Sequence, residues 1–482
     1  MTRIALAAVL IAAGCAPAAK NERAGDGHPR PFTGPVAAPV EPVRLPPIAS
    51  ETLANGLEVL VLEDHELPIV SMTLLWTVGA EADPPDKAGL TSLTASLLRQ
   101  GTRTRDARGI AEAIDFVGGS LEGGADVDSA RVGVQVLSRD VELGLDLLAD
   151  VATNPSFPEE EIADLKRVEI ASVRQVHDDP SELGRRHLRR LIYGDDHPYA
   201  RFPTEDSIAA ITRADLVSWH ATRFRPGVAI LAIAGDVKAS AILPRVRASF
   251  GVWERGDAKV PEIPEPPPAK RRIRIVDKPD LTQSSIRVAH LGIRRSAPDY
   301  HATIVANYIL GGGTFSSRLL RVLRSQEGKT YGVGSGFTVH KGLGPFGVST
   351  STRTEETLAT LELVLAEMER IREKGVTSAE LEAAKRNLVG RYPSYFETPQ
   401  GVVSEVLGAK LLGVPLSEIE AYRGRIAGLT LAEVNAAAAR RFRPSDAVIV
   451  IVGNAEEIRG PIEAKLGPVE VVKWTEEPKG RM

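Results

Sequence analysis

Few side chains of this sequence are placed to do chemistry, and the clearest group lies in one segment of its second half. Three consecutive glycines, Gly311, Gly312 and Gly313, are followed by Arg324 and, seven residues further on (331 − 324 = 7), by Tyr331. Consecutive glycines allow unusual φ values or a close approach of the backbone, which is useful where a peptide must lie against the chain. Taken singly, Arg324 could be a cation near a helix end, Tyr331 a strand residue with one polar tip, and the glycines a turn. As one ordered segment they favour a functional site.

The histidines and the single cysteine predict neither a metal site nor a nucleophile. The nine histidines form no H-x-x-H or H-x-x-x-H pair, and the sequence has no Gly-rich phosphate loop, Cys-rich metal set or G-x-S-x-G elbow. A net charge of −4 and an aromatic content of 5% argue against a nucleic-acid partner. We therefore expect no bound metal or other cofactor in this chain and no nucleic acid among its partners.

A segment of the first half has the frame of a metal site without its ligands. Residues 89–102 read G-L-T-S-L-T-A-S-L-L-R-Q-G-T. This resembles the inverted zinc-binding helix of the insulinase/pitrilysin (mitochondrial-processing-peptidase-like) metallopeptidase family, G-L-A-H-x-x-E-H-x-x-x-x-G-T. The resemblance puts Ser92 and Ser96 where the family has its two histidines, and Ala95 where it has the general-base glutamate. Hydroxymethyl and methyl groups neither hold Zn²⁺ nor take a proton from its water.

The family's further zinc ligand is missing as well. In the family this glutamate lies in a segment like R-E-M-x-x-x-x-D-N-P, and counting back from Asp179 and Pro180 puts Ser172 at its position. All four functional positions therefore carry small residues, as expected for a subunit that no longer binds zinc. By contrast, residues 310–331 are similar to the family's L-G-G-G-x-x-S-R-L…L-R-x-x-x-G-x-x-Y segment, and Arg324 and Tyr331 match its R/Y pair.

The resemblance implies roles for these retained residues. Arg324 would hydrogen-bond a carbonyl of an extended substrate, and the phenol of Tyr331 would stabilise the oxyanion that develops during peptide hydrolysis. Gly311, Gly312 and Gly313 are the candidate substrate-binding residues beside them. His197, in the family-like segment G-D-D-H-P-Y, is expected to be structural.

The folded part of the chain repeats itself. The words R-F-R-P at residues 223–226 and 441–444 are separated by 441 − 223 = 218 residues, and Gly235 and Gly453, which end the apolar runs that follow, by 453 − 235 = 218. Such an offset indicates duplicated domains. The Pro-rich stretch around residue 265 is the best candidate for a linker between them.

Periodicity predicts a mixture of strands and helices in each half. Strands are expected at residues 57–62 and 69–78, and helices at 141–151, 158–176, 358–374 and 378–388. Strands and helices without strict alternation favour an α+β fold. The resemblance implies two homologous α/β sandwich domains that close like a clam shell. We expect an N-terminal peptidase-like domain at 48–262, a linker at 263–272 and a C-terminal peptidase-like domain at 273–476.

The start of the sequence predicts export. A positive start and an apolar run too short to span a bilayer suggest a signal peptide over residues 1–14, and the Ala-Gly-Cys that ends at Cys15 resembles a bacterial lipobox with lipidation of Cys15. Ordinary secretion, with cleavage after Ala18, is the alternative. Residues 15–47, rich in Pro and Ala, predict a tether. By analogy, a lipoprotein at the outer membrane, facing the periplasm, is expected.

Together these features predict a catalytically incomplete subunit of a heteromeric zinc metallopeptidase. It would supply Arg324 and Tyr331 to a homologous H-x-x-E-H partner that carries the zinc, and peptides would bind as an added strand at a sheet edge. Alone, it is expected to have no zinc peptidase activity. The alternative is a non-enzymatic peptide-binding or assembly lipoprotein of the same fold.

Overall fold

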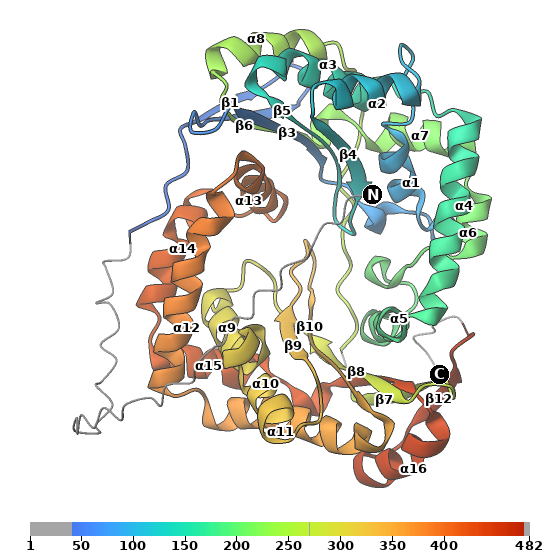
Figure 1. Ribbon diagram of the computed structural model, residues 1–482, viewed down its shortest axis with the longest axis vertical. Helices are drawn as coiled ribbons and strands as arrows, with labels where there is room; N and C mark the ends of the chain where they lie inside the picture. The colour runs from blue at the N-terminus through green and yellow to red at the C-terminus, as the bar shows by residue number, and fades with distance from the viewer. Residues whose placement is uncertain (1–40, 269, 477–482) are drawn as a thin grey trace, which may run out of the picture. The chain divides into compact units, whose positions relative to one another are not determined.

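The computed structural model describes residues 41–268 and 270–476, and it places a six-stranded sheet in each half of the chain (Figure 1). The strands of the first half are β1 (Ile48–Thr52), β2 (Glu58–Glu63), β3 (Ile69–Trp76), β4 (Ser120–Ala125), β5 (Ala130–Leu137) and β6 (Ala229–Gly235). Its helices are α1 (Leu90–Leu97), α2 (Ala107–Phe116), α3 (Val141–Thr153), α4 (Glu159–Gln175), α5 (Pro180–Tyr193), α6 (Glu205–Ala210), α7 (Arg213–Arg223) and α8 (Ala239–Phe250).

The second half is built in the same way. Its strands are β7 (Arg272–Asp277), β8 (Gln283–Leu291), β9 (Val333–Phe337), β10 (Pro345–Arg353), β11 (Val448–Gly453) and β12 (Glu470–Lys473). Its helices are α9 (Tyr300–Asn307), α10 (Arg318–Leu320), α11 (Thr357–Lys374), α12 (Ser378–Arg391), α13 (Pro399–Leu411), α14 (Ser417–Gly428), α15 (Leu431–Arg441) and α16 (Ala455–Leu466). Two π-helical segments, η7 (Tyr308–Gly312) and η9 (Arg321–Gln326), flank α10.

Five of the six strands follow one topology in both sheets, and the sixth differs, since β1 pairs antiparallel to β2 whereas β12 pairs parallel to β7. Their strand orders are β1-β2-β6-β3-β5-β4 and β12-β7-β11-β8-β10-β9, with β2–β6 and β7–β11 parallel and the pairs from β6 to β4 and from β11 to β9 antiparallel. Every residue of β6 and of β11 is buried. Such strands read as continuous apolar runs because both faces of the sheet are covered. The strands β4 and β9 lie at corresponding edges.

The repeated sequence segments include equivalent helix starts in the two halves. Thr212 and Thr430 begin α7 and α15, and each side chain accepts a hydrogen bond from the backbone three residues on while Asp215 or Glu433 bonds back to the threonine backbone. Two otherwise unpaired N–H groups are satisfied in each of these capping boxes. The repeats therefore mark helix starts, and the predicted duplication is confirmed by the equivalent sheets.

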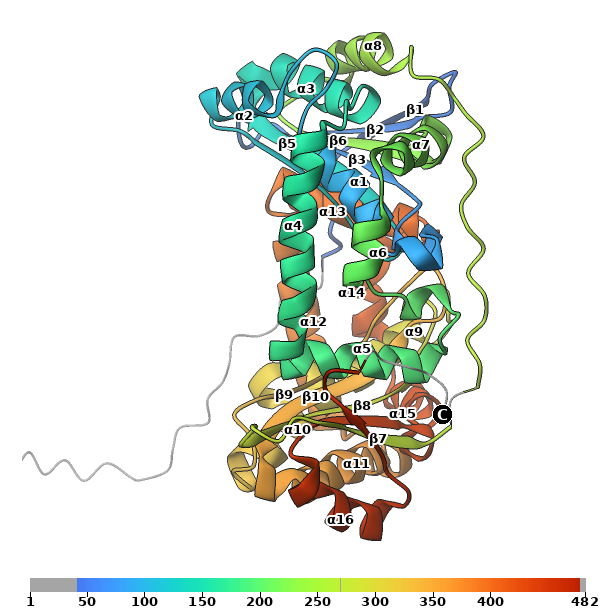
Figure 2. The ribbon, with the colours of Figure 1, turned by 90° about the vertical axis from the view of Figure 1, so that its right-hand side faces the viewer.

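Each half also covers the inner face of the sheet in the other half. Val403 and Val406 of α13 pack against Leu62 and Ile230 of the first sheet. In return, α5 of the first half packs against the second sheet (Figure 2), where its residues join Val276, Val450 and Val452 in one apolar cluster.

These two helices are themselves equivalents, since Pro399 and Pro180 stand at their first turns at an offset of 399 − 180 = 219. Proline suits a first helical turn because its missing N–H would have no partner there. The exchange joins both halves into one compact unit.

Much of the predicted structure is confirmed. The predicted strands are β2 and β3, and the predicted helices are α3, α4, α11 and α12, with ends that differ by a few residues. No helix or strand is assigned between 254 and 268 or at 270 and 271. Within the described residues no helix is long and apolar enough to cross a bilayer. The predicted signal peptide, Cys15 and most of the predicted tether lie outside the described residues.

Candidate functional site

The helix α1 carries the residues that replace the zinc-binding motif. Ser92 and Ser96, one turn apart on one face, are half-buried, whereas Ala95 is fully buried. A methyl group on Gly123 of β4 would lie 2.6 Å from the carbonyl oxygen of Ala95, so helix and edge strand are in direct backbone contact. Ser172 lies exposed on α4. The frame of the site is therefore closely packed although its ligands are absent.

A buried carboxylate holds the start of α1. Asp83 accepts hydrogen bonds from the backbone N–H groups of Gly89 (2.8 Å) and Thr91 (2.9 Å) and from the Thr91 hydroxyl (2.5 Å). The indole of Trp219 donates to the same hydroxyl at 3.0 Å. Burial raises the pKa of Asp83 to about 6, although these hydrogen bonds act in the opposite direction. The helix is thus fixed by residues outside the metal motif.

The residues at the four motif positions do not fit a zinc ion. Zinc in proteins is bound by Cys, His, Asp or Glu side chains, and the four positions carry serine and alanine. Over the described ranges, no group of three or more His, Cys, Asp or Glu residues could hold a metal ion. His197, the histidine of the G-D-D-H-P-Y segment, instead bonds the backbone of Tyr199 and Pro264.

The three glycines of the second half pack closely against the chain itself. A methyl group on Gly311 would lie 2.5 Å from the hydroxyl of Ser335 on β9, and one on Gly313 would lie 2.7 Å from the ring of Tyr308. Both glycines are buried and only Gly312 is exposed. Close packing therefore explains two of the three glycines, and their predicted contact with substrate stays a prediction.

Arg324 and Tyr331 are brought together at the surface. The guanidinium carbon of Arg324, on η9, lies 4.8 Å from the ring centroid of Tyr331, which precedes β9 and is 86% exposed. It lies 5.3 Å from the ring of Phe315, which is 77% exposed. Stacking of this kind orients a guanidinium while its N–H groups stay available. Arg324 and Tyr331 therefore lie next to each other. Phe315, which the sequence did not single out, lies beside Arg324 as well.

The other arginine of this segment has a structural role. Arg318 is buried and forms two hydrogen bonds of 2.7 Å with the carboxylate of Glu380, and a third of 3.0 Å with the carbonyl of Gly375. The hydrogen bonds from Arg318 lower the pKa of Glu380 to about 2, against the effect of burial. Arg318 therefore holds the segment that carries Arg324 to α12.

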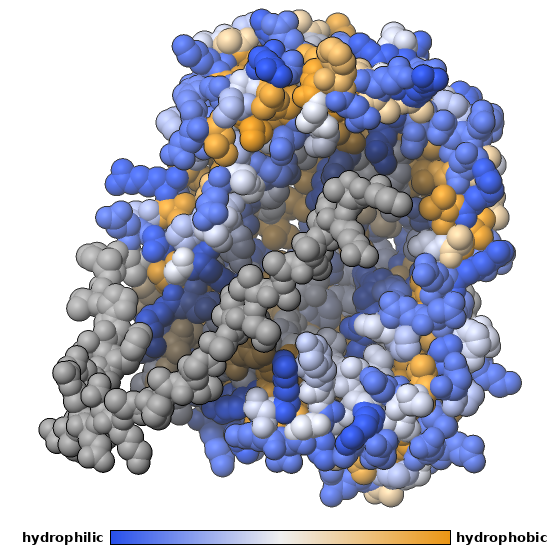
Figure 3. All heavy atoms as spheres, in the orientation of Figure 1, coloured by the Kyte–Doolittle hydropathy of each residue, from blue (hydrophilic) through white to orange (hydrophobic). Residues whose placement is uncertain are grey.

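Between the two sheets the body is hollowed (Figure 3). A cavity of about 480 Å³ lies between the edge of the first sheet and α13, and it is lined by residues including Glu122, Gly123, Gly124, Arg131, Val403 and Leu407. Because β4 is paired only by β5, its other edge can accept a further strand. The glycines of β4 leave that approach free of side chains.

Polar residues after β9 connect the halves, and the sequence did not point to them. The ammonium of Lys341 lies 2.6 Å from the buried carboxylate of Glu81, and His340 lies 2.9 Å from Asp128, whose other oxygen accepts from Tyr199. These partners are far apart in the sequence and follow no repeat, so no signal in the sequence could have paired them.

Comparison with known proteins places the chain in a family. The insulinase (peptidase family M16) profile matches residues 58–199, and the peptidase M16 inactive domain profile matches residues 210–388. The crystal structure titled peptidase M16 inactive domain, from Pseudomonas fluorescens, is 31% identical, with a TM-score of 0.80, and the match covers 85% of this chain and 98% of that one. The chain belongs to peptidase family M16.

Relatives within family M16 bear contrasting names. An uncharacterized zinc protease of Mycobacterium leprae is 29% identical over 81% of this chain and 88% of its own length. A protein of Helicobacter pylori named non-peptidase homolog YmxG is 25% identical over 83% of this chain and 92% of its own length. The present M16 chain is of the inactive type, because its four motif positions carry serine and alanine.

Proposed function

We propose that this M16 chain is the catalytically incomplete subunit of a heteromeric zinc metallopeptidase. One observation carries the proposal: Arg324 and Tyr331 stand together at the surface, while the four positions that would hold and serve a zinc ion carry only serine and alanine. A homologous partner with an intact H-x-x-E-H motif would hold the zinc. This chain would bind the peptide and contribute to stabilising charge on its reacting carbonyl.

The substrate is an extended peptide. A peptide that adds a strand to a sheet edge is recognised through its backbone, and β4 and β9 each have one edge without a partner strand in the described sheets. Arg324 would donate to a peptide carbonyl, and the phenol of Tyr331 would donate to the oxygen that gains negative charge as the carbonyl is attacked. The Tyr331 ring is 86% exposed, and Arg324 beside it is half-buried.

The serine and alanine at the four motif positions favour a second chain as the carrier of the metal. In both ribbon views α1 lies in the upper half of the body, whereas β9 and α10 lie in the lower half (Figures 1 and 2). The frame of the lost zinc site and the retained pair thus belong to different sheets. A heterodimer would let the retained pair face the partner's zinc helix.

We further propose that the chain is an exported lipoprotein, anchored through Cys15 to the outer membrane on its periplasmic side. The support is the apolar start of the sequence and the Ala-Gly-Cys before a Pro- and Ala-rich stretch. The test is the distribution of the full chain and of Cys15→Ser between membranes and soluble fraction. Sedimentation of both with membranes would contradict lipidation at Cys15.

The decisive test of the main proposal is peptide hydrolysis by the full chain, by its H-x-x-E-H partner and by their mixture, with bound zinc counted in each. Activity in the mixture, with the zinc on the partner, supports the split enzyme. Activity of this chain alone, with one zinc per chain, would contradict it. Assembly without activity would favour the non-enzymatic peptide-binding or assembly role.

A further inference from the structure

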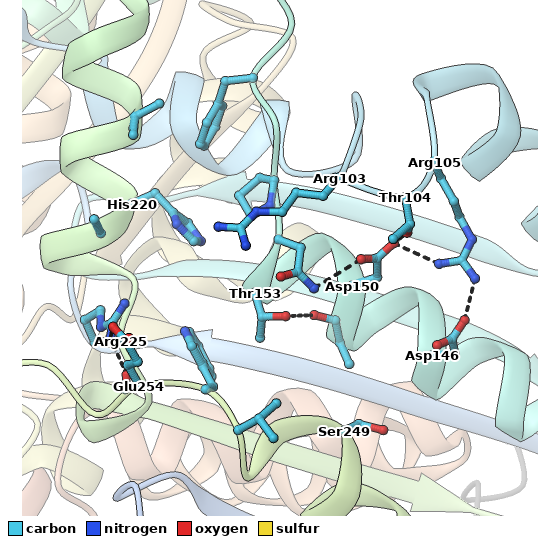
Figure 4. A pocket seen from close by; sticks show the side chains of 18 residues that line it. Arg103, Thr104, Arg105, Asp146, Asp150, Thr153, His220, Arg225, Ser249 and Glu254 are labelled. Carbon is cyan, nitrogen blue, oxygen red and sulfur yellow. Dashed lines mark hydrogen bonds and ion pairs between the residues drawn. The ribbon is translucent and has the colours of Figure 1, made fainter.

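A second cavity lies on the opposite side of the first sheet from the cavity against α13. Its volume is about 800 Å³, within the usual range of small-molecule sites. It is lined by α3, by α7, by the loop at 103–105, by the end of α8 and by residues 252–254 that follow it (Figure 4). These helices cover the sheet face formed by Val61, Met72 and Ile233, whereas α13 covers the opposite face of the same sheet. The cavity is therefore separate from the candidate peptidase site.

One end of this cavity is acidic, but its charges are matched. Asp150 accepts three hydrogen bonds of 2.8 Å, from the hydroxyls of Thr102 and Thr104 and from Arg105. Arg105 also pairs with Asp146 at 2.6 Å. Burial would raise the pKa of Asp150, but these hydrogen bonds outweigh it and keep the pKa below its usual value. The acidic end is a closed network that needs no cation from a ligand.

The other end carries positive charge on Arg103 and Arg225. Arg103 points into the cavity toward His220 (Figure 4), and its guanidinium forms no ion pair with any described residue. His220 donates from Nε2 to the carbonyl of Ala152 at 2.9 Å. Burial, aided by the charges of Arg225 and Arg103, lowers the pKa of His220 to about 4, so the imidazole is neutral at pH 7.

Buried donors in the same lining lack acceptors. Arg225 is 9% exposed and Trp253 is 6% exposed, and among the described residues neither Arg225 Nε nor Trp253 Nε1 has a hydrogen-bond partner. Buried donors are normally paired, and an unpaired one costs about 1–3 kcal/mol. Arg225 also donates from Nη2 to the backbone carbonyl of Glu254 and lies 3.5 Å from the largely exposed Glu254 carboxylate, so a ligand would share its charge with Glu254.

The remaining lining is apolar. Val252 is 83% exposed and Val217 is 41% exposed, and both border the cavity together with the buried ring of Phe157. Large hydrophobic side chains left in water at the edge of a cavity suit a ligand with an apolar part. The largely exposed carboxylate of Glu254 would repel a dianion such as phosphate more strongly than a single carboxylate.

We infer that this cavity binds a monocarboxylate with an apolar body, held by Arg103 and Arg225 and covered by Val217 and Val252. The guanidinium groups would each donate to the carboxylate, the geometry for which arginine is best suited. Two sources share this chemistry: the C-terminal residue of a peptide and a free aliphatic acid. This site is independent of the proposed peptidase function, since it uses neither α1 nor the Arg324–Tyr331 pair.

The test is calorimetric binding to the full chain of three probes: N-acetyl-Ala-Ala-Phe with a free carboxylate, the same peptide as its C-terminal amide, and octanoate. The carboxylate peptide should bind at least about tenfold more tightly than the amide, as expected for hydrogen bonds to a charged group. Tighter binding of the peptide than of octanoate identifies a peptide C-terminus, and the reverse identifies a free acid. Equal affinity for peptide acid and amide, or no binding of either acid, overturns the inference.

Variants locate the binding. Arg103→Ala should weaken the carboxylate probes about tenfold and leave the amide unaffected. Val252→Glu should weaken them through like-charge repulsion, and because Val252 is exposed this change tests the site without disturbing the core. The matched control is Arg108→Ala, an exposed arginine of α2 outside the cavity lining. Equal losses with Arg103→Ala and Arg108→Ala would contradict a site in this cavity.

Discussion

Two corresponding segments, one in each half of this molecule, differ in the functional residues that they carry. Each precedes the edge strand of its sheet and packs against that strand through a glycine: α1 against Gly123 of β4, and η7, through Gly311, against Ser335 of β9. The first segment carries serine and alanine where the family has its zinc-binding histidines and its general-base glutamate. The second segment continues from η7 to the start of β9, and over residues 308–331 it includes Arg324 and the exposed Tyr331.

The difference teaches that the frame of a site and its chemistry depend on separate residues. The start of α1 is held by Asp83, Thr91 and Trp219, none of which stands at one of the four zinc-site positions. The second segment is held by Arg318 and Glu380 in the same way. Loss of the metal ligands therefore leaves the packing of α1 intact.

The strongest way to break this comparison is to remove the chemistry of the second segment. In the complex with the H-x-x-E-H partner, Tyr331→Phe should lower kcat by about 10²–10³-fold, the usual effect of losing one oxyanion donor. Arg324→Ala should lower kcat/KM and also weaken peptide binding. Thermal unfolding of the subunit should not change, because the Tyr331 ring is 86% exposed. Arg108→Ala is the control, and parental rates for both site variants would show that the site is misassigned.

The frame of the first segment can be broken separately. Gly123→Ala would bring a methyl group to 2.6 Å from the Ala95 carbonyl, whereas the neighbouring Gly124→Ala meets nothing within 4 Å. Gly123→Ala should therefore lower the free energy of unfolding by about 1–3 kcal/mol, and Gly124→Ala by much less. Denaturant titrations of both variants measure this difference. Equal losses would mean that α1 and β4 are not in close contact.

The comparison can be sharpened by returning part of the lost chemistry. Ser92→His combined with Ser96→His puts two imidazoles at i and i+4 on a half-buried face, the spacing at which a helix binds zinc. At a zinc concentration about ten times the Kd, binding should raise the free energy of unfolding by about 1.4 kcal/mol. Ser92→His alone is the control. The double variant should remain without peptidase activity because Ala95 and Ser172 are unchanged, and no zinc-dependent gain in stability would show that the frame of α1 no longer admits the metal.

The smallest expected effect concerns pH, and it differs in sign between the segments. The pKa of Glu380 is lowered from 4.5 to about 2, so its ion pair stabilises the fold above pH 4.5 and this contribution is lost as pH falls toward 2. After solvent screening it amounts to about 1 kcal/mol. The stability difference between the parent chain and Glu380→Gln should therefore shrink over that window in denaturant titrations. A difference independent of pH would contradict the ion pair.

Asp83 should respond in the opposite direction. Its pKa is raised from 3.8 to about 6, so the folded chain binds a proton more readily than the unfolded chain, and its contribution to stability falls as pH rises through that window. The two acids thus distinguish the two segments by titration alone.

Much of the fold was predictable because its signals are local. The apolar run of β2 and the threonine capping boxes of α7 and α15 depend on neighbours within a few positions. The lost zinc site was visible for the same reason, since its motif occupies one helix. The closeness of Arg324 and Tyr331 was also expected from an ordered segment.

The remaining features depend on partners far apart in the sequence. The apolar residues of α5 predict a buried face, but not that Val276 and Val450 of the other half would cover it. The contact of Lys341 with Glu81 joins residues 260 positions apart (341 − 81 = 260). The second cavity is assembled from loops and helix ends, where periodicity carries no information.

The exchange of α5 and α13 between the sheets has a consequence for ancestry. In a two-fold dimer, each protomer could pack one helix against the sheet of its partner. If the two copies were then joined end to end, the interface between them would lie within one chain and would have the arrangement seen here. Such an ancestor would have carried every surface segment twice. After fusion either copy of a segment was free to diverge, provided that the helix which the other half needs was kept.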